Sequence, residues 1–175
     1  RLAPEFPFPT AIEDLYHAYA WLLKQGYPAK QILFAGDGAG GNLALALTHN
    51  LLGRNLPLPA ALVLLSPWTD LSCEQIGNSA NKNLDLINSK ETLVNIAHQY
   101  TYASNFTNPQ ASPCFADYSH FPPVYIQCGS QEILLEDAKY LKSKLEAAQT
   151  QVILDVEEGM WHLFQAIDSL TPKAH

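Results

Sequence analysis

The sequence has 175 residues, of which 47% are hydrophobic and 15% are charged, and its formal net charge is −7. A chain of this length forms a single domain and buries roughly 70% of its unfolded surface. The acidic balance argues against nucleic acid and anionic membrane surfaces as partners. No apolar run approaches the roughly 20 residues of a transmembrane helix, so no membrane span is expected. Three widely spaced cysteines without a C-x-x-C motif predict reduced, buried thiols and a cytoplasmic protein: Cys73, Cys114 and Cys128.

The first expected element is a helix that begins near residue 10. Thr10 and Glu13 have the spacing of a capping box. Apolar residues follow at helical spacing: Ile12, Leu15, Tyr16, Tyr19, Leu22 and Leu23. We expect this helix to end at Gly26, which suits a left-handed C-terminal residue, because Pro28 blocks its continuation.

The rest of the chain is organised around Gln31–Asn42, QILFAGDGAGGN. The apolar run Gln31–Gly36 predicts a buried strand, and Asn42–Asn50 is rich in helix formers that extend to about Leu52. A second strand is expected at Ala61–Leu65. Strand, helix and strand within so few residues form a βαβ unit with parallel strands.

The glycines of this turn allow a dinucleotide-binding interpretation. Gly36, Gly38 and Gly41 spell G-x-G-x-x-G, but that fingerprint needs an acidic residue at the end of the next strand. The next strand ends at Leu65, and the nearest acid, Asp70, follows too late. A dinucleotide-binding domain is therefore the lowest-ranked alternative.

The second interpretation is a nucleophile elbow, G-x-S-x-G, in which a serine lies on a tight strand-to-helix turn. The frame Gly36–Gly40 has its flanking glycines in place, and the nucleophile position is Gly38. Glycine has no side chain that could attack a carbonyl carbon. The pattern predicts an esterase scaffold without its nucleophile.

The segment 67–122 differs from the rest because it is polar and rich in asparagine. After an expected N-cap at Ser89 it contains an amphipathic patch, which comprises Leu93, Ile96, Ala97 and Tyr100. We interpret 67–122 as an insertion within one domain, over the C-terminal edge of the sheet, where it could act as a lid. A plain surface insertion is the alternative.

Regular structure resumes after this segment. Strands are expected at Val124–Cys128 and Val152–Val156, and helices at Leu135–Ala148 and His162–Leu170. Strands that alternate with helices predict the α/β class with a parallel sheet.

Three positions follow strand ends, where active sites of open α/β sheets lie. They are Gly38, Glu132 and His162, in the order nucleophile position, acid and histidine that α/β-hydrolases use. Taken alone, Glu132 could be a solvated acid or an N-terminal partner of the next helix, and His162 could be a satisfied core histidine. Their shared order and placement favour a site.

Five stretches together resemble the hormone-sensitive-lipase branch of the α/β-hydrolases, and the resemblance spans essentially all 175 residues. They are RLAPEFPFPTAIEDLYHAYAWLL, FAGDGAGGNLALAL, LVLLSPWTDL, ASPCFADYSHFPPVYIQCGSQEILLEDA and EEGMWHLF. The resemblance implies a carboxylic ester hydrolase, an esterase or lipase of Ser-His-Glu type that uses no cofactor or metal. It places Gly38 at the serine of G-D-S-A-G-G, Glu132 at the acid, His162 at the histidine, and Ala39 at the backbone N–H of the oxyanion hole.

The resemblance is to the C-terminal portion of such an enzyme, with the first strands and the H-G-G-G oxyanion loop upstream of Arg1. We therefore expect a fragment, one half of a split protein or a degraded gene product. With Gly38 at the nucleophile position, hydrolysis is expected to be absent or nearly so. The alternative is a non-catalytic binding module that keeps an ester or acyl pocket. The expected partners are a small ester or acyl ligand and a second copy or another chain that supplies the missing strands.

Overall fold

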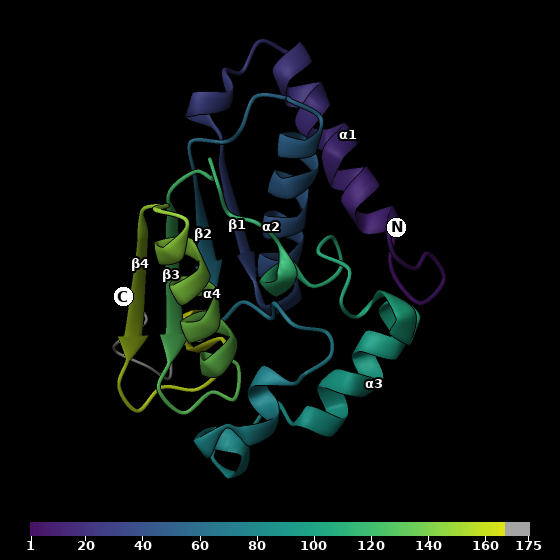
Figure 1. Ribbon diagram of the computed structural model, residues 1–175. Coiled ribbons are helices and arrows are strands. Elements are labelled where there is room, and N and C mark those ends of the chain that lie inside the picture. The colour runs from purple at the N-terminus through teal and green to yellow at the C-terminus, as the bar shows by residue number, and fades with distance from the viewer. Residues whose placement is uncertain (167–175) are drawn as a thin grey trace.

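The structure, a computed structural model, describes residues 1–166. Within that range four parallel strands form one sheet in the order β1-β2-β3-β4. The strands are β1 (Leu33–Asp37), β2 (Ala61–Leu65), β3 (Val124–Gly129) and β4 (Val152–Glu157). The helices are α1 (Thr10–Lys24), α2 (Gly38–Gly53), α3 (Lys90–Tyr100) and α4 (Leu135–Ala147). The α/β class with a parallel sheet is confirmed (Figure 1).

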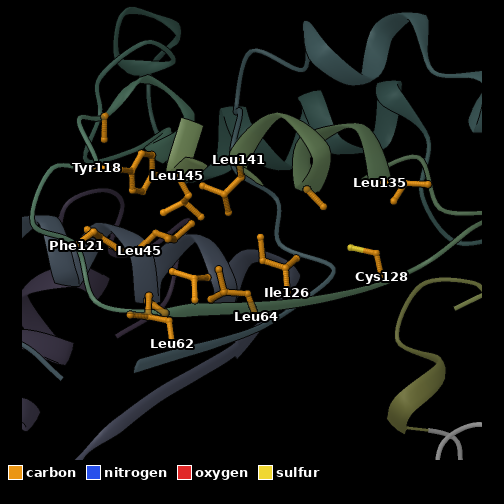
Figure 2. Close-up of a cluster of buried hydrophobic side chains, with 14 residues drawn as sticks. Leu45, Leu62, Leu64, Tyr118, Phe121, Ile126, Cys128, Leu135, Leu141 and Leu145 are labelled. Carbon is orange, nitrogen blue, oxygen red and sulfur yellow. The ribbon is translucent and has the colours of Figure 1, made fainter. Parts of the chain in front are cut away.

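The main core lies between the sheet and two helices on one of its faces. Leu45 of α2 and Leu141 of α4 pack together with Leu62 and Leu64 of β2 and Ile126 of β3, and all five side chains are fully buried (Figure 2). Burial of each such side chain stabilises the fold by about 1.5–3 kcal/mol. This packing fixes the start of α2 relative to the C-terminal ends of β2 and β3.

The two edges of the sheet expose apolar side chains. Leu33 on β1 is 59% exposed and Ile153 on β4 is 55% exposed. In residues 1–166, β1 is hydrogen-bonded to β2 along one side only. An unpaired strand edge is a site for association.

Several expected boundaries shift in the structure. The first strand begins at Leu33 rather than Gln31, because Ala29–Gln31 form a 3₁₀ turn. The second helix begins at Gly38 rather than Asn42. The strands at Ala61–Leu65 and near Val124 are confirmed, with β3 and β4 each one residue longer than expected.

The helix termini give mixed outcomes. The capping box is wrong: Thr10 lies inside α1, Pro9 occupies the N-cap position, and no side chain caps the helix. The Ser89 cap of α3 is confirmed, since its hydroxyl accepts a hydrogen bond from Thr92 N. Gly26 is also confirmed, with a φ of +90°.

The helix expected at His162–Leu170 is only partly covered by the structure. Within the described residues, 162 and 163 form a turn, and Phe164–Ala166 form a single 3₁₀ turn. The remainder, 167–170, lies outside them.

Candidate active site

Position 38 lies where β1 meets α2. Gly38 is buried and has a φ of +43°, a left-handed conformation that costs other residues about 1–3 kcal/mol. The turn is tight, because a Cβ on Gly36 would lie 2.3 Å from the carbonyl carbon and oxygen of Gly40. A Cβ on Gly41 would lie 2.9 Å from Cβ of Pro67. Close packing of strand and helix therefore accounts for these glycines without a dinucleotide.

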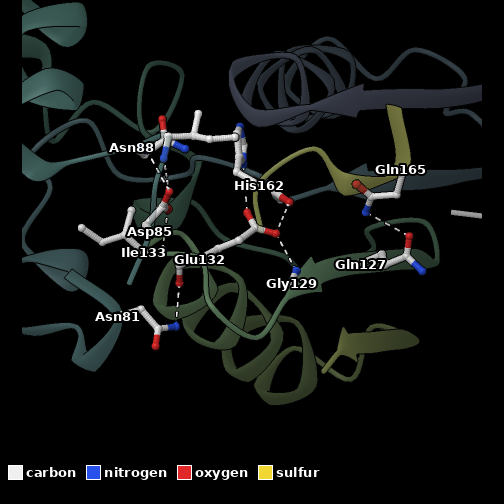
Figure 3. Close-up of polar contacts among 11 residues, drawn as sticks. Asn81, Asp85, Asn88, Gln127, Gly129, Glu132, Ile133, His162 and Gln165 are labelled. Atoms are coloured by element: carbon white, nitrogen blue, oxygen red, sulfur yellow. Dashed lines mark hydrogen bonds and ion pairs between the residues drawn. The ribbon is translucent and has the colours of Figure 1, made fainter. Parts of the chain in front are cut away.

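Glu132 lies in the loop between β3 and α4 and is fully buried. Its Oε1 accepts hydrogen bonds from the backbone N–H of Gly129 and from Ser66 Oγ, the latter at 2.7 Å. Its Oε2 is 2.9 Å from Nδ1 of His162. These contacts use both carboxylate oxygens and fix the plane of the group (Figure 3).

His162 follows β4 and is 7% exposed. With Nδ1 bound to Glu132, its Nε2 faces the start of α2. An ideal Cβ at Gly38 would lie 3.7 Å from Nε2 and 3.6 Å from Cε1 of His162, which is ordinary van der Waals contact. The structure therefore brings Gly38, Glu132 and His162 together at the C-terminal edge of the sheet.

The loop that carries His162 is held against β3. A Cβ on Gly129 would lie 2.3 Å from the carbonyl oxygen of Met160, so only glycine allows this approach. The same carbonyl oxygen accepts a hydrogen bond from Gln131 N at 3.0 Å. Ser130 Oγ accepts another from Gly159 N at 2.9 Å. These contacts hold the loop of His162 next to the loop of Glu132.

Three positioning residues were not expected from the sequence. Ser66, at a φ of +46° directly after β2, is buried and donates to Glu132. Asn81 Nδ2 donates to the carbonyl oxygens of Ser130 and Glu132, both at 2.8 Å. Asp85 Oδ2 accepts from Ile133 N at 2.8 Å (Figure 3). The segment 67–122 thus supports the loop of Glu132.

Ala39 is the second residue of α2 and is exposed. The first N–H groups of a helix have no partner within the helix, and the helix dipole makes this end attractive to negative charge. The N–H of Ala39 is therefore a donor at the edge of the site.

A cavity of about 210 Å³ opens beside Ala39. It lies between the start of α2, helix α3 and the N-terminal segment. Its lining is mainly apolar and includes Asn42, Leu43, Trp68, Leu71, Ile96 and Tyr100. Two of these residues, Ile96 and Tyr100, come from α3, inside 67–122.

A second buried carboxylate lies near the C-terminal end of β2. Asp137, in the first turn of α4, accepts hydrogen bonds at Oδ2 from the backbone N–H groups of Thr69 and Asp70, at 2.7 and 3.0 Å. Burial raises its pKa to about 7. Asp137 therefore connects the start of α4 to Thr69 and Asp70, in the segment that follows β2.

The described residues 1–166 contain no cluster of three or more His, Cys, Asp or Glu side chains that could hold a metal ion. The same range has no helix long and apolar enough to cross a membrane.

A parallel sheet with a glycine-rich strand-to-helix turn, a buried acid and a histidine at successive strand ends defines the α/β-hydrolase class. In agreement, a model of the alpha/beta hydrolase fold matches residues 1–166. The chain belongs to the hormone-sensitive-lipase-like family of α/β-hydrolases.

Individual relatives support this assignment. An acetyl-hydrolase of Streptomyces hygroscopicus is 37% identical over 99% of this chain and 58% of its own length. An esterase of Acinetobacter venetianus is 38% identical over 99% of this chain and 57% of its own length. The crystal structure of an esterase from the bacterial hormone-sensitive lipase family superposes with a TM-score of 0.95 at 40% identity, over 99% of this chain and 58% of that one. The chain thus spans somewhat more than half the length of these relatives.

Proposed function

We propose that the chain carries the acid and histidine of a carboxylic ester hydrolase of Ser-His-Glu type, with Gly38 at the nucleophile position. The observation that supports this most is the buried pair of Glu132 and His162, whose free ring nitrogen faces Gly38. With glycine at position 38 the chain forms no acyl-enzyme, because glycine offers no hydroxyl group.

Each residue has a role in this proposal. Glu132 orients the imidazole of His162 and stabilises its charged form, and His162 serves as general base. The N–H of Ala39 donates to the oxyanion that develops on the ester carbonyl. A serine at position 38 would place Oγ one bond beyond Cβ, within about 2.6–3.2 Å hydrogen-bond reach of Nε2.

The cavity beside Ala39 is proposed to receive the acyl group. Its volume of about 210 Å³ is below the roughly 300–1,000 Å³ of pockets for drug-sized ligands. The substrate class is therefore esters of short carboxylic acids. Because α3 lines the cavity, we propose that 67–122 acts as an insertion that covers it.

A second candidate function is a non-catalytic module that binds an ester or acyl ligand. Gly38 favours such a module, because it removes the reactive group and leaves the acid, the histidine and the cavity in place. In residues 1–166 both β1 and β4 pair along one side only, and an unpaired edge of this kind can accept another strand, for example from a second copy.

A cytoplasmic location is part of the proposal. Cys73, Cys114 and Cys128 are free and buried. Burial raises the pKa of the Cys73 thiol to about 12 and that of the Cys114 and Cys128 thiols further still. Reduced thiols of this kind are typical of a reducing compartment.

A fluorophosphonate probe tests the hydrolase assignment. We expect no labelling of the wild-type chain, labelling at position 38 of Gly38→Ser, and none of the matched Gly38→Ala variant. Labelling of Gly38→Ser should disappear in Gly38→Ser/His162→Gln. Turnover of p-nitrophenyl butyrate by Gly38→Ser is expected to be measurable only when the polypeptide that the longer relatives carry is also supplied. Stoichiometric labelling of the wild-type chain, at Ser66 or Ser130 for example, would refute the proposal.

A further inference from the structure

We propose that the site at Gly38 binds short-chain carboxylates, and that each carboxylate binds together with a proton on His162. This inference rests on the proposed function, because it names a ligand of the same site. It predicts a protein that binds the carboxylate of a short-chain acid and does not hydrolyse the corresponding ester.

The first evidence is the state of the His162 ring. Only 9% of the surface of its side chain is exposed. Nδ1 is bound to Glu132, whereas Nε2 has no hydrogen bond to any residue in the described part of the chain. It points at the space that a side chain at position 38 would fill, with 3.7 Å between Nε2 and an ideal Cβ there. Protonation turns Nε2 into a donor aimed into this space.

The second evidence is the end of α2 on the other side of that space. This helix has 16 residues, so its dipole favours an anion at its N-terminus. The N–H of Ala39 is unpaired within the helix. A carboxylate has two oxygens, and here one would accept from Nε2 of His162 and the other from Ala39 N. Ala39 also lines the apolar cavity, which would take the alkyl chain.

The charges around His162 explain why a proton must accompany the ligand. Glu132 contacts Nδ1 from the β3–α4 loop and offsets the charge of the imidazolium. Asp37, at the end of β1, lies 3.9 Å from an ideal Cβ of Gly40 and opposes an anion, but its side chain is exposed and screened by salt. Cys128 of β3 lies beside Glu132 and is neutral, because burial raises its pKa. With a neutral imidazole no full positive charge pairs with the carboxylate, so the imidazolium must supply it.

The test is titration of the wild-type chain with sodium acetate and sodium butyrate, followed by calorimetry and by the imidazole signals of its six histidines in NMR spectra. His162→Gln identifies the signal of residue 162. We expect the pKa of that histidine to rise on saturation with butyrate, and the dissociation constant to increase about tenfold or more between pH 6 and pH 8. Butyrate should bind more tightly than acetate because of the cavity.

Three variants and one ligand serve as controls. His98→Gln changes an exposed side chain of α3 that does not line the cavity, and it should bind butyrate as the wild type does. His162→Gln should lose both the affinity and its pH dependence. Gly38→Ser should bind more weakly, because its side chain fills the space. Methyl butyrate, which is uncharged, should leave the pKa of His162 unchanged.

The inference fails if wild-type chain does not bind butyrate, if binding is equal at pH 6 and pH 8, or if the pKa of His162 stays constant on saturation. The comparison of butyrate binding at pH 6 and pH 8 uses only folded wild-type protein, so it does not depend on the stability of a variant. His162-dependent fluorophosphonate labelling of Gly38→Ser, together with any of these failures, would overturn this inference and leave the proposed function intact.

Discussion

Replacement of Gly38 by alanine or serine tests whether position 38 lies in a strained elbow. Its φ of +43° costs a non-glycine residue about 1–3 kcal/mol. The unfolded chain of the variant has a smaller conformational entropy, and this offsets about 0.5–1 kcal/mol of that cost. Steric clash adds nothing, because the nearest atoms to an ideal Cβ are 3.6 and 3.7 Å away. We therefore expect Gly38→Ala to lower the free energy of unfolding by about 1 kcal/mol.

Gly38→Ser carries the same backbone cost and adds a hydroxyl group beside Nε2 of His162. A hydrogen bond there contributes about 0.5–1.5 kcal/mol, so Gly38→Ser should lie between the wild type and Gly38→Ala. Urea denaturation followed by circular dichroism measures the three stabilities. Gly53→Ala, at an open position of α2 without positive φ, is the matched control and should be stabilising. If Gly38→Ala is at least as stable as the wild type, position 38 is not strained and the elbow interpretation is wrong.

The isolated 175-residue chain should self-associate in sedimentation velocity, and Leu33→Lys on the exposed edge of β1 should reduce this. A monodisperse wild-type monomer would contradict the prediction. For Asp137, the folded pKa of about 7 exceeds the ordinary 3.8, so this group binds more protons in the native state than in the unfolded state. Its contribution to the free energy of unfolding therefore falls by about 2–4 kcal/mol as pH rises from 4 to 7. Asp137→Asn, whose amide oxygen can still accept from Thr69 and Asp70, should flatten that slope in denaturation curves; an unchanged slope would refute the assignment. The native protein should show no thiols reactive with a disulfide reagent, and three after unfolding, because the cysteines are buried.

The strands and the class of fold could be predicted because their signals are local. Apolar runs at Ala61–Leu65 and Val124–Cys128 are bounded by proline or glycine, and the alternation of strands and helices follows from them. The sequence does not predict that α2 begins at Gly38, because glycine is a poor helix former. Packing of the Gly36–Gly41 turn against Pro67 overrides that preference.

The residues that support the site could not be predicted, because their partners are distant in sequence. Ser66 and Glu132 are 66 positions apart, and Asp85 and Ile133 are 48 apart. No periodicity links such pairs. A serine followed by Pro67 directly after a buried strand was a weak signal that the chain turns sharply there. The roles of Gly38, Ala39, Glu132 and His162 in chemistry stay predictions.

The positions of the site residues along the chain lead us to expect that the site assembles in a definite order. Glu132 and His162 are 30 positions apart and belong to one β3–α4–β4 unit, so closing this contact costs little loop entropy. Gly38 belongs to a separate β1–α2–β2 unit. The two units meet where β2 pairs with β3, across the whole of 67–122. Because contacts between distant segments form slowly, we expect pairing of β2 with β3 to be the folding step that brings His162 to Gly38. Substitutions where β2 pairs with β3 should then delay the formation of the site and leave the contact between His162 and Glu132 intact.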